Sequence, residues 1–341
     1  MSSIIVTGGA GYIGSHTVVE LKKAGYTPIV VDNFVNSERL VINRLESIIQ
    51  DKVKVYEGDC NDAKFLDHVF SSEKNLTGCI HFAAYKAVGE SVEKPLKYYK
   101  NNVNSLITLI DQMINHGIQN LVFSSSCTVY GQPDDLPVTE ASPKKPAESP
   151  YGNTKQICEE ILEDSLKAET NIKSIALRYF NPIGAHESSK IGELPIGVPN
   201  NLIPYLTQTV AGMRKELVIF GDDYDTPDGS CIRDFIHVED IAIAHVKALR
   251  YLEKKGGNSC FEAFNLGTGK GNSVLEVIRT FEKATGLSVN YKIGPRREGD
   301  IEKVWADTKK ANELLEWTAM KSLEQSLTDS WNWQKTLKKD A

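Results

Sequence analysis

A glycine-rich segment near the N-terminus constrains the fold more than any other feature of the sequence. The apolar run SIIVT is followed at once by Gly8, Gly9, Gly11 and Gly14, which satisfy the pattern G-x-G-x-x-G from Gly9 onward. Glycine is needed at such positions because side chains would keep a pyrophosphate away from the amide groups of the following helix. A second apolar run, TPIVVD, ends in Asp32, where a carboxylate is expected to accept hydrogen bonds from ribose hydroxyls. The segment therefore predicts a strand–helix–strand unit that binds a dinucleotide.

The acidic residue also indicates which dinucleotide is bound. A carboxylate at Asp32 would repel the extra phosphate of NADP, and no arginine stands at 33–37 to receive that phosphate, so we predict NAD. Asp59, at the end of a third apolar run, is expected near the adenine end of the cofactor. An equally good interpretation makes it the N-cap of a helix that begins at Asn61 or Asp62.

Strand-like and helical segments alternate through residues 1–180. Nearly continuous apolar strands of this kind are typical of a parallel sheet that is covered on both faces. We predict an α/β fold in which 1–180 is a doubly wound parallel sheet, an NAD-binding Rossmann domain. The six expected strands are SIIVTG, TPIVVD, KVKVYEGD, GCIHFAA, NLVFSSS and KSIALRYF.

The pattern changes after Phe180, and 181–341 is predicted to be a smaller mixed α/β substrate domain. A long loop is expected from Asn181 to Asn201, where several glycines and prolines punctuate the chain. Further elements are expected at 202–214 (helix), 217–220 (strand), 238–254 (helix) and in a strand–helix–strand group ending near 293. Leu323, Leu327 and Trp331 recur at helical spacing in the last segment, which indicates a core-facing helix.

Composition excludes several classes of function. The chain has 341 residues and a formal net charge of -6, which argues against a nucleic-acid binder. Six cysteines lie too far apart for a zinc knuckle or a disulfide framework, and the histidines form no metal-binding pair, so we expect reduced thiols, no metal site and a cytoplasmic protein. The sequence shows neither a secretory signal nor an apolar stretch long enough to span a membrane.

The candidate reacting groups lie at the end of the fifth strand and at the start of the next helix. The strand ends in Ser124, Ser125 and Ser126, and carboxyl ends of parallel strands face the ligand crevice. Tyr151 and Lys155 are four residues apart and share one helix face.

The spacing Y-x-x-x-K alone is uninformative, because Tyr251 and Lys255 repeat it at the end of another helix. That second pair is expected on a solvated surface. The pair at 151 and 155 is favoured because the serine-rich strand end precedes it on a sheet that already carries the nucleotide motif.

These three residues suit the oxidation of an alcohol by hydride transfer. A base must take the hydroxyl proton, and a tyrosine with a pKa of about 10 is a poor base at neutral pH. A nearby lysine ammonium and the positive nicotinamide ring both favour the phenolate of Tyr151. Lowering that pKa to about 7 takes roughly 4 kcal/mol of differential interaction, and Ser126 would hydrogen-bond the reacting oxygen.

Several longer motifs extend this interpretation to a family. The sequence resembles the UDP-glucose 4-epimerases among the extended short-chain dehydrogenases/reductases over nearly its whole length. The resemblance is carried by VTGGAGYIGSHT, HFAAYKAVGESVEKPLKYY, FSSSCTVYG, SPYGNTK, LRYFNPIGAH, PNNLIPY, RDFIHVEDIA, NLGTG and PRREGD. RYFNPIGAH, PNNLIPY and PRREGD are the most specific of these.

The resemblance implies site residues by position. Tyr151 is the implied general base and acid, with Lys155 and Ser126 as partners. The implied cofactor-binding positions are Gly8, Gly11, Tyr12, Ile13, Gly14, Asp32, Asn33, Asn36, Ser37, Asp59, Cys60, Phe82, Ala83, Ala84, Lys86, Asn101, Ser126, Tyr151, Lys155 and Phe180. The implied substrate-binding positions are Lys86, Ser126, Tyr151, Tyr179, Asn181, Asn200, Asn201, Leu202, Phe220, Arg233, Arg297, Asp300 and Val304. Tyr85 departs from the family, which often has an aliphatic residue there.

The implied activity is reversible epimerisation at carbon 4 of a UDP-hexose, UDP-glucose to UDP-galactose, through a transient 4-keto sugar. The NAD is held tightly and regenerated in each cycle, and a homodimer is a further expectation. Val304 stands where some bacterial relatives have tyrosine, so UDP-N-acetylglucosamine and UDP-N-acetylgalactosamine are also expected to interconvert. In relatives the chain crosses back, so part of 230–270 is expected to pack on the Rossmann domain.

Other functions within and outside the superfamily remain open. A UDP-pentose or UDP-uronate 4-epimerase would carry the same motifs. Nucleotide-sugar 4,6-dehydratases carry an Asp-Glu pair where this chain has Cys127, Thr128 and Val129, which disfavours elimination. A non-catalytic NAD-binding regulator would be expected to lack one of the three reacting residues, and all three are present.

Overall fold

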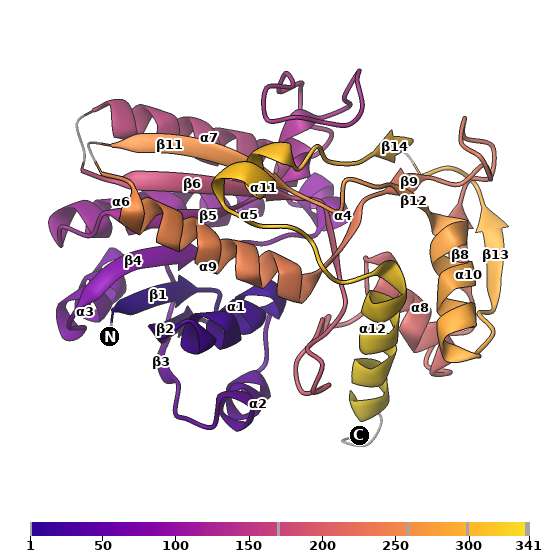
Figure 1. The fold of residues 1–341 in the computed structure, drawn as a ribbon, viewed down its shortest axis with the longest axis horizontal. Coiled ribbons are helices and arrows are strands. Elements are labelled where there is room, and N and C mark those ends of the chain that lie inside the picture. Colours follow the sequence, from indigo (N-terminus) through magenta and orange to yellow (C-terminus); the bar gives the residue numbers. More distant parts are fainter. Residues whose placement is uncertain (1, 169–170, 257–258, 298–299, 338–341) are drawn as a thin grey trace.

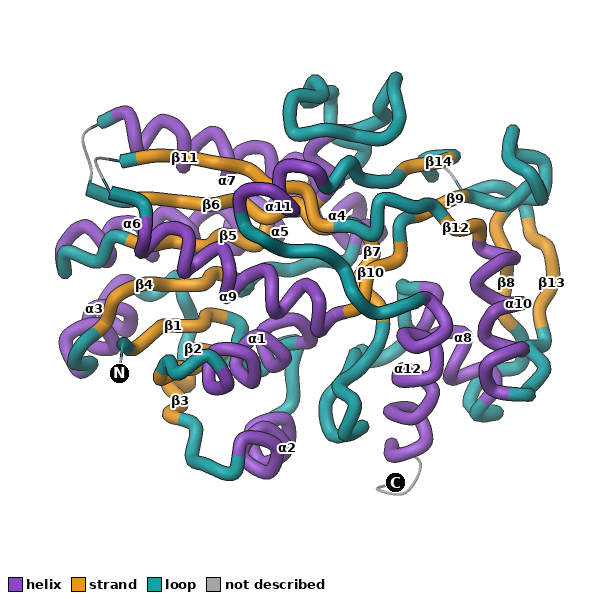
Figure 2. Tube along the Cα trace, viewed as in Figure 1, coloured by secondary structure: helices purple, strands orange, loops and turns teal. Residues whose placement is uncertain are grey.

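A seven-stranded parallel sheet forms the larger part of the molecule (Figures 1 and 2). The computed structural model describes residues 2–168, 171–256, 259–297 and 300–337. Across the sheet the strands follow the order β11-β6-β5-β4-β1-β2-β3. Their bounds are β1 Ser3–Thr7, β2 Thr27–Asp32, β3 Lys54–Glu57, β4 Leu76–His81, β5 Asn120–Ser126, β6 Lys173–Tyr179 and β11 Cys260–Leu266. The predicted doubly wound parallel sheet is thereby confirmed.

The seventh strand is the one that the sequence analysis did not count. β11 pairs with β6 in parallel, from Cys260 opposite Lys173 to Leu266 opposite Tyr179. Its sequence, CFEAFNL, contains a glutamate and an asparagine, so it lacks the continuous apolar run by which the other strands were recognised. β11 and the helix α9 Val238–Lys254 both fall in the range 230–270; β11 extends this sheet and α9 covers one of its faces. The division of the chain into two domains at residue 180 stays a prediction.

Helices cover both faces of the sheet. One face carries α1 Tyr12–Lys23, α2 Leu40–Ile49 and α9 Val238–Lys254, with α11 Lys309–Leu314 beside β11, and the other carries α3 Ala63–Ser72, α6 Asn104–Asn115 and α7 Pro150–Lys167. Along β1, Ile4 and Val6 pack into the first layer and Ile5 into the second. Every residue of β1 is therefore buried, which is why its sequence is a continuous apolar run rather than an alternating one.

The smaller part packs α8 Leu202–Val210, α10 Val274–Thr285 and α12 Leu323–Leu337 against a parallel pair of strands, β8 Leu217–Phe220 and β13 Tyr291–Gly294. Leu327 is fully buried here, and the ring of Trp331 meets Phe281 edge-on at 6.1 Å, so the stripe predicted on the last helix is core packing. α8 ends at Val210, short of the predicted 214, because Gly212 has a φ of +75° and leaves the helical conformation.

Two small sheets lie at the carboxyl edge of the large one. β7 Asn181–Ile183 pairs with β10 Phe235–His237, and β9 Ile232–Arg233 lies between β12 Asn272–Ser273 and β14 Lys303–Val304. The region predicted as one long loop therefore begins with a strand. The remaining short elements are α4 Val88–Glu93, α5 Pro95–Tyr98, the π-helical turn η1 Tyr99–Val103 and the 3₁₀ turn η2 Cys127–Tyr130.

The strand order reverses between β1 and β4, and ligands of open α/β sheets bind outside the carboxyl ends of the strands at such a point. Thr7 at the end of β1 is level with Val31 of β2 and His81 of β4. The segments that follow these strands therefore emerge side by side.

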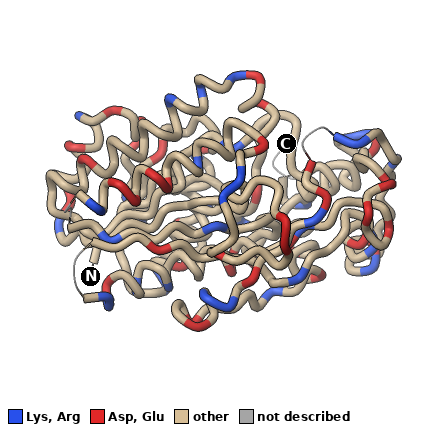
Figure 3. Tube along the Cα trace, turned by 90° about the horizontal axis from the view of Figure 1, so that it is seen from above, with Lys and Arg blue, Asp and Glu red and all other residues tan. Residues whose placement is uncertain are grey.

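Viewed from above, Lys and Arg are interspersed with Asp and Glu along the chain (Figure 3).

Candidate active site

One large cleft, about 950 Å³ in volume, opens at this carboxyl edge. All the predicted cofactor residues line it, and so do all the predicted substrate residues except Leu202 and Phe220. Leu202 packs against the core of the smaller part, and Phe220 lies beneath the guanidinium of Arg297 at 5.5 Å. The cleft thus brings together residues from 8 to 304, while the individual binding roles stay predictions.

The glycine-rich turn leaves no room for side chains. A Cβ at Gly8, whose φ is +68°, would stand 2.8 Å from the backbone nitrogen of Ala83 after β4, and a Cβ at Gly14 would stand 2.2 Å from the carbonyl oxygen of Gly8. Helix α1 begins at Tyr12 with Gly11 as its N-cap, and no side chain in the described part of the chain caps it. Its first amide groups and the positive end of its dipole are therefore available to an anion, which fits the pyrophosphate of a dinucleotide.

Asp32 is fixed beside this turn. One carboxylate oxygen accepts the amide of Ala10 at 3.0 Å, and the other accepts the amide of Phe34 and the hydroxyl of Ser37, both at 2.9 Å. A carboxylate has about four acceptor positions, so Asp32 keeps capacity for ribose hydroxyls. These contacts fit NAD, because a phosphate on the ribose would meet a carboxylate held in place by three donors.

The alternative role for Asp59 is wrong. Helix α3 is capped by Asp62, whose carboxylate accepts the amides of Lys64 and Phe65, while Asp59 accepts the amide and side-chain nitrogen of Asn61, each at 2.8 Å. Asp59 lines the cleft and is not the N-cap.

Ser126, Tyr151 and Lys155 meet on the floor of the cleft. Helix α7 begins with the Ser149 hydroxyl accepting the amide of Gly152 and with Pro150 in its first turn, which places Tyr151 at the helix start beside the end of β5. The Ser126 side chain acts on the phenol in the direction that lowers the pKa of Tyr151. The ammonium of Lys155 lies 5.9 Å from the centre of the Tyr151 ring and donates to the carbonyl oxygen of Ser124 at 2.7 Å.

Burial governs the protonation of this group. It raises the pKa of Tyr151 well above its usual value, while it lowers the pKa of Lys155 to about 8. Ser126 opposes this rise in the pKa of Tyr151 only in part. With the chain's own groups alone, the phenol is therefore neutral at pH 7, so the phenolate argued from the sequence requires further positive charge in the cleft.

The second Tyr–Lys pair lies elsewhere. Tyr251 and Lys255 both contact the carboxylate of Glu262 on β11, and neither lines the cleft.

Arg233 and Arg297 both line the cleft and both contact the carboxylate of Asp300. Asp300 lies between them, with one oxygen 2.6 Å from Arg297 and 3.8 Å from Arg233. Val304 pairs with Arg233 in the small sheet and is almost fully buried. Two guanidinium groups held side by side present the planar donor forks that suit a diphosphate.

Tyr85 fits the cleft without disturbing its backbone. Its amide donates to the Asn102 side-chain oxygen at 2.8 Å, and its carbonyl accepts the Asn102 side-chain nitrogen at 3.0 Å. The ring lies against Tyr98 and beneath the ammonium of Lys97, 4.1 Å from the ring centre. The departure from the family at this position thus leaves the main chain held on both sides.

Sequence reasoning missed Glu193. This residue lines the cleft, and one of its carboxylate oxygens lies 2.8 Å from the ammonium of Lys86 and 2.7 Å from the side-chain nitrogen of Asn201. No local sequence pattern predicts this contact, because Lys86 is more than one hundred positions away from Glu193 in the chain.

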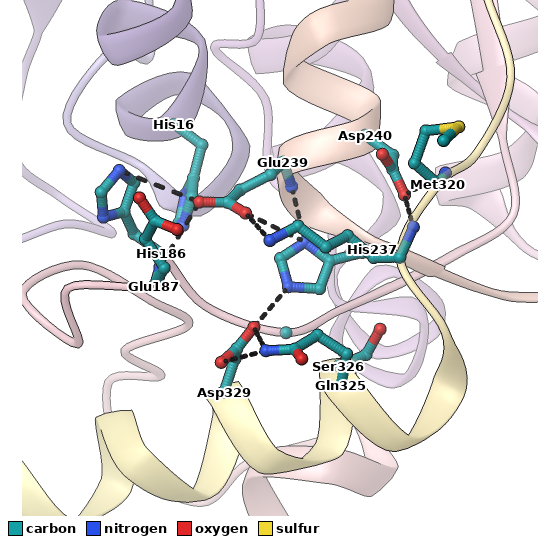
Figure 4. A network of polar contacts seen from close by, with 12 residues as sticks. His16, His186, Glu187, His237, Glu239, Asp240, Met320, Gln325, Ser326 and Asp329 are labelled. Atoms are coloured by element: carbon teal, nitrogen blue, oxygen red, sulfur yellow. Dashed lines mark hydrogen bonds and ion pairs between the residues drawn. The ribbon is translucent and has the colours of Figure 1, made fainter.

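A buried polar network ties the cofactor-side helix to the last helix (Figure 4). Tyr12 donates to the carbonyl of Gly184 at 2.6 Å, and Gly184 packs on the ring of His237, where a Cβ would stand at 2.5 Å. One nitrogen of His237 accepts the amide of Glu239 at 3.0 Å, and the other lies 3.3 Å from the carboxylate of Asp329 in α12. The network therefore fixes α1, β10 and α12 relative to one another.

Neither a metal centre nor a membrane-spanning helix lies within residues 2–168, 171–256, 259–297 and 300–337. No group of three or more His, Cys, Asp and Glu residues there could hold a metal ion. None of the helices among those residues is both long enough and apolar enough to cross a membrane.

Comparison with known proteins points to one family. A family model described as GDP-mannose 4,6 dehydratase matches residues 5–330. The UDP-glucose 4-epimerase of Erwinia amylovora is 48% identical over 97% of both chains, and that of Mus musculus is 48% identical over 98% of this chain and 97% of its own.

Solved structures agree. A UDP-glucose 4-epimerase from Stenotrophomonas maltophila, with NAD and formylated UDP-arabinopyranose, has a TM-score of 0.96 at 43% identity and covers 100% of both chains. One from Bifidobacterium longum, with NAD⁺ and UDP, has a TM-score of 0.93 at 45% identity and covers 98% of both.

Proposed function

The chain belongs to the UDP-glucose 4-epimerases of the extended short-chain dehydrogenase/reductase family, and we propose that its large cleft holds NAD at the glycine-rich end and a UDP-hexose between Tyr151 and the paired arginines. The protein is an isomerase that inverts carbon 4 of a UDP-hexose with NAD as its cofactor. Since oxidation and reduction cancel over one cycle, the cofactor is regenerated within the site.

The cofactor residues act by shape and by hydrogen bonds. Gly8, Gly11 and Gly14 let the pyrophosphate approach the start of α1, and Asp32 receives the ribose hydroxyls. Phe82, Ala83 and Ala84, which directly follow β4, line the same cleft beside the cofactor. When bound, NAD supplies the acceptor for the hydride of carbon 4 and returns that hydride to the other face of the sugar.

The reacting residues move one proton. Tyr151 takes the proton of the sugar 4-hydroxyl and later gives it back, while Ser126 holds the same oxygen by a hydrogen bond. The Lys155 ammonium, oriented by its bond to the Ser124 carbonyl, favours the phenolate form of Tyr151.

Substrate anchoring is separated from the chemistry. Arg233 and Arg297 grip the diphosphate at the far end of the cleft, so the sugar can turn between the two half-reactions without leaving. Binding energy from the UDP portion thus serves a step in which the sugar itself is loosely held.

The observation that carries this assignment is that Ser126, Tyr151 and Lys155 line the same cleft as the glycine turn and the arginine pair. We expect purified protein to convert UDP-galactose to UDP-glucose without added NAD, as read by chromatography of the sugar nucleotides. Tyr151→Phe should lower the rate by about 10²- to 10⁴-fold, the usual contribution of a general base, and should keep bound NAD.

Tyr251→Phe is the matched control, because it removes the same hydroxyl from the Tyr–Lys pair outside the cleft. Its rate should equal that of the unaltered protein. Full activity in Tyr151→Phe would show that another group is the base.

The range of sugars is a second part of the proposal. Val304 is small and lines the cleft, so we infer that a 2-acetamido group fits and that UDP-N-acetylgalactosamine is also converted. Val304→Tyr should abolish that conversion and spare UDP-galactose. Equal rates of UDP-N-acetylgalactosamine turnover in both proteins would contradict this role. A UDP-pentose remains a second candidate substrate, because the Stenotrophomonas relative was solved with a formylated UDP-arabinopyranose.

Two further proposals concern the state of the protein. We infer a homodimer, because Ile107 and Ile114 stand two turns apart on α6 with 40% and 46% of their surface exposed, which suits a helix face covered by a partner. Light scattering should give twice the chain mass, and Ile107→Glu should give the monomer. A cytoplasmic location is supported by six free cysteines.

A further inference from the structure

Glu193 is an unusual residue for its surroundings. The cleft receives two diphosphates in the proposed function, yet the Glu193 side chain places a negative charge inside it with only 11% of its surface exposed. Its influence reaches the cofactor end, where it helps to raise the pKa of Tyr12. A carboxylate that opposes anionic ligands in this way must be offset by its own partners.

Those partners come from opposite sides of the cleft. A single oxygen of Glu193 receives both the Lys86 ammonium, from the segment after β4, and the Asn201 amide, from the residue that precedes α8. The Lys86 side chain is 48% exposed and Asn201 is exposed as well, so the bridge lies at the solvent edge of the cleft, with the carboxylate of Glu193 largely buried between its two partners. It joins the segment that follows β4 to the segment that precedes α8.

The backbone of Glu193 is fixed from behind. Its carbonyl accepts the indole N–H of Trp333 in α12 at 2.9 Å, and a Cβ at the neighbouring Gly192 would stand 2.6 Å from the same ring. Because Trp333 is buried, the carboxylate is held at the bridge by the core of the smaller part.

We propose that Glu193 is a positioning residue that holds Lys86 and Asn201 together across the sugar end of the cleft and so retains the 4-keto sugar between the two half-reactions. This inference rests on the proposed function. The paired arginines hold the diphosphate, but they leave the sugar free to turn; a bridge across the open edge hinders escape without fixing the sugar itself.

Escape has a defined chemical outcome. If the 4-keto sugar leaves after the first half-reaction, one hydride stays on the cofactor, one proton is released, and UDP-4-ketohexose enters solution. Each escape therefore converts one molecule of enzyme to a form with reduced cofactor. The released ketone can be trapped with borodeuteride and identified by mass spectrometry.

The test compares Glu193→Gln with Glu148→Gln during turnover of UDP-galactose. Glu148 is an exposed carboxylate that lines the same cleft, so its variant makes the same chemical change away from the bridge. For Glu193→Gln we expect the trapped ketone per turnover to rise more than tenfold, with reduced cofactor accumulating as the rate decays. The unaltered protein and Glu148→Gln should show neither.

Lys86→Met provides a second route to the same bridge. This variant removes the ammonium partner of the bridge, so its release of trapped ketone per turnover should match that of Glu193→Gln. The double variant should release no more ketone than either single variant. If Glu193→Gln does not fold, Lys86→Met alone decides the matter, by releasing or not releasing more trapped ketone per turnover than the unaltered protein.

The failures are distinguishable. Folded Glu193→Gln that keeps its NAD through gel filtration and releases no more ketone than the unaltered protein would overturn the inference. Independent, additive effects of the two substitutions would also overturn it. Absence of UDP-galactose conversion by the unaltered protein would instead overturn the proposed function, and this inference with it.

Discussion

A buried ion pair behind the reacting residues should be one of the most sensitive points of the fold. The guanidinium of Arg178 on β6 makes two contacts with the carboxylate of Glu159 on α7, at 2.6 and 2.9 Å, and both side chains are almost completely buried. Ser125 donates to the same carboxylate at 2.6 Å, one residue before Ser126. Glu159 lies about two turns after Tyr151 on α7, so the pair ties the strand that carries Ser126 to the helix that carries the phenol.

The cost of breaking this pair follows from what is left behind. Arg178→Met leaves a buried carboxylate, and removing one partner of a buried pair costs about 3–5 kcal/mol. Lys144 keeps a 2.8 Å contact with Glu159 from the surface, so the lower end, about 3 kcal/mol, is expected. At about 2.1 cal/mol/K of unfolding entropy per residue, this is a fall of roughly 4 °C in Tm for cooperative unfolding.

Thermal unfolding followed by tryptophan fluorescence, with NAD at saturation, measures this change. The control is the double variant Arg178→Met/Glu159→Leu, which removes both charges and should recover at least half of the lost stability, because apolar replacements of a buried pair are often neutral. A double variant no more stable than Arg178→Met alone would refute the reasoning, since the loss would then come from packing and not from the unpaired charge.

Two further predictions concern the cofactor turn and acid. Gly14→Ala should lose bound NAD on gel filtration, because its Cβ would stand 2.2 Å from the Gly8 carbonyl oxygen, whereas Gly89→Ala, with no atom within 4 Å of the added group, should keep it. Burial lowers the pKa of His16 and His81 to about 3 and that of His245 to about 4. Below pH 6.5 the unfolded chain therefore binds more protons than the folded chain. The free energy of unfolding should fall by about 1.4 kcal/mol for each ring with every pH unit below that value, and this contribution is complete above it. Urea midpoints at pH 7.5 and 5 test this, and equal midpoints would contradict it.

The parts of the molecule that the sequence predicted are those with local signals. The glycine turn, Asp32 and the Tyr151–Lys155 pair each lie within one strand–turn–helix unit, where spacing alone determines which groups share an edge or a face. The alternative that made Asp59 the cap of α3 was wrong because Asp59 and Asp62 both precede the helix, and only the backbone conformation decides which of them meets its amides.

Long-range contacts produced the remaining gaps. β11 completes the sheet although Glu262 interrupts its apolar run, since that carboxylate turns to Tyr251 and Lys255 and leaves the strand free to pair with β6. Glu193 was not predicted for a similar reason. Its contacts with Lys86 and Asn201 are determined by the tertiary fold and not by any spacing in the sequence.

Tyr151 shows that the protonation state of a predicted site residue depends on burial as well as on nearby charge. The sequence argument weighed the charges expected near the phenol but had no means of weighing the loss of water around it. In the structure Tyr151 is 8% exposed and Lys155 is 4% exposed, so burial disfavours the phenolate and also the ammonium that should stabilise it. The Lys155 ammonium also donates one of its hydrogen bonds to the Ser124 carbonyl oxygen. The same burial makes any positive charge that enters the cleft with the ligands act strongly on the phenol, since charges interact more strongly where water is excluded. Basicity of Tyr151 therefore depends on positive charge beyond that of Lys155.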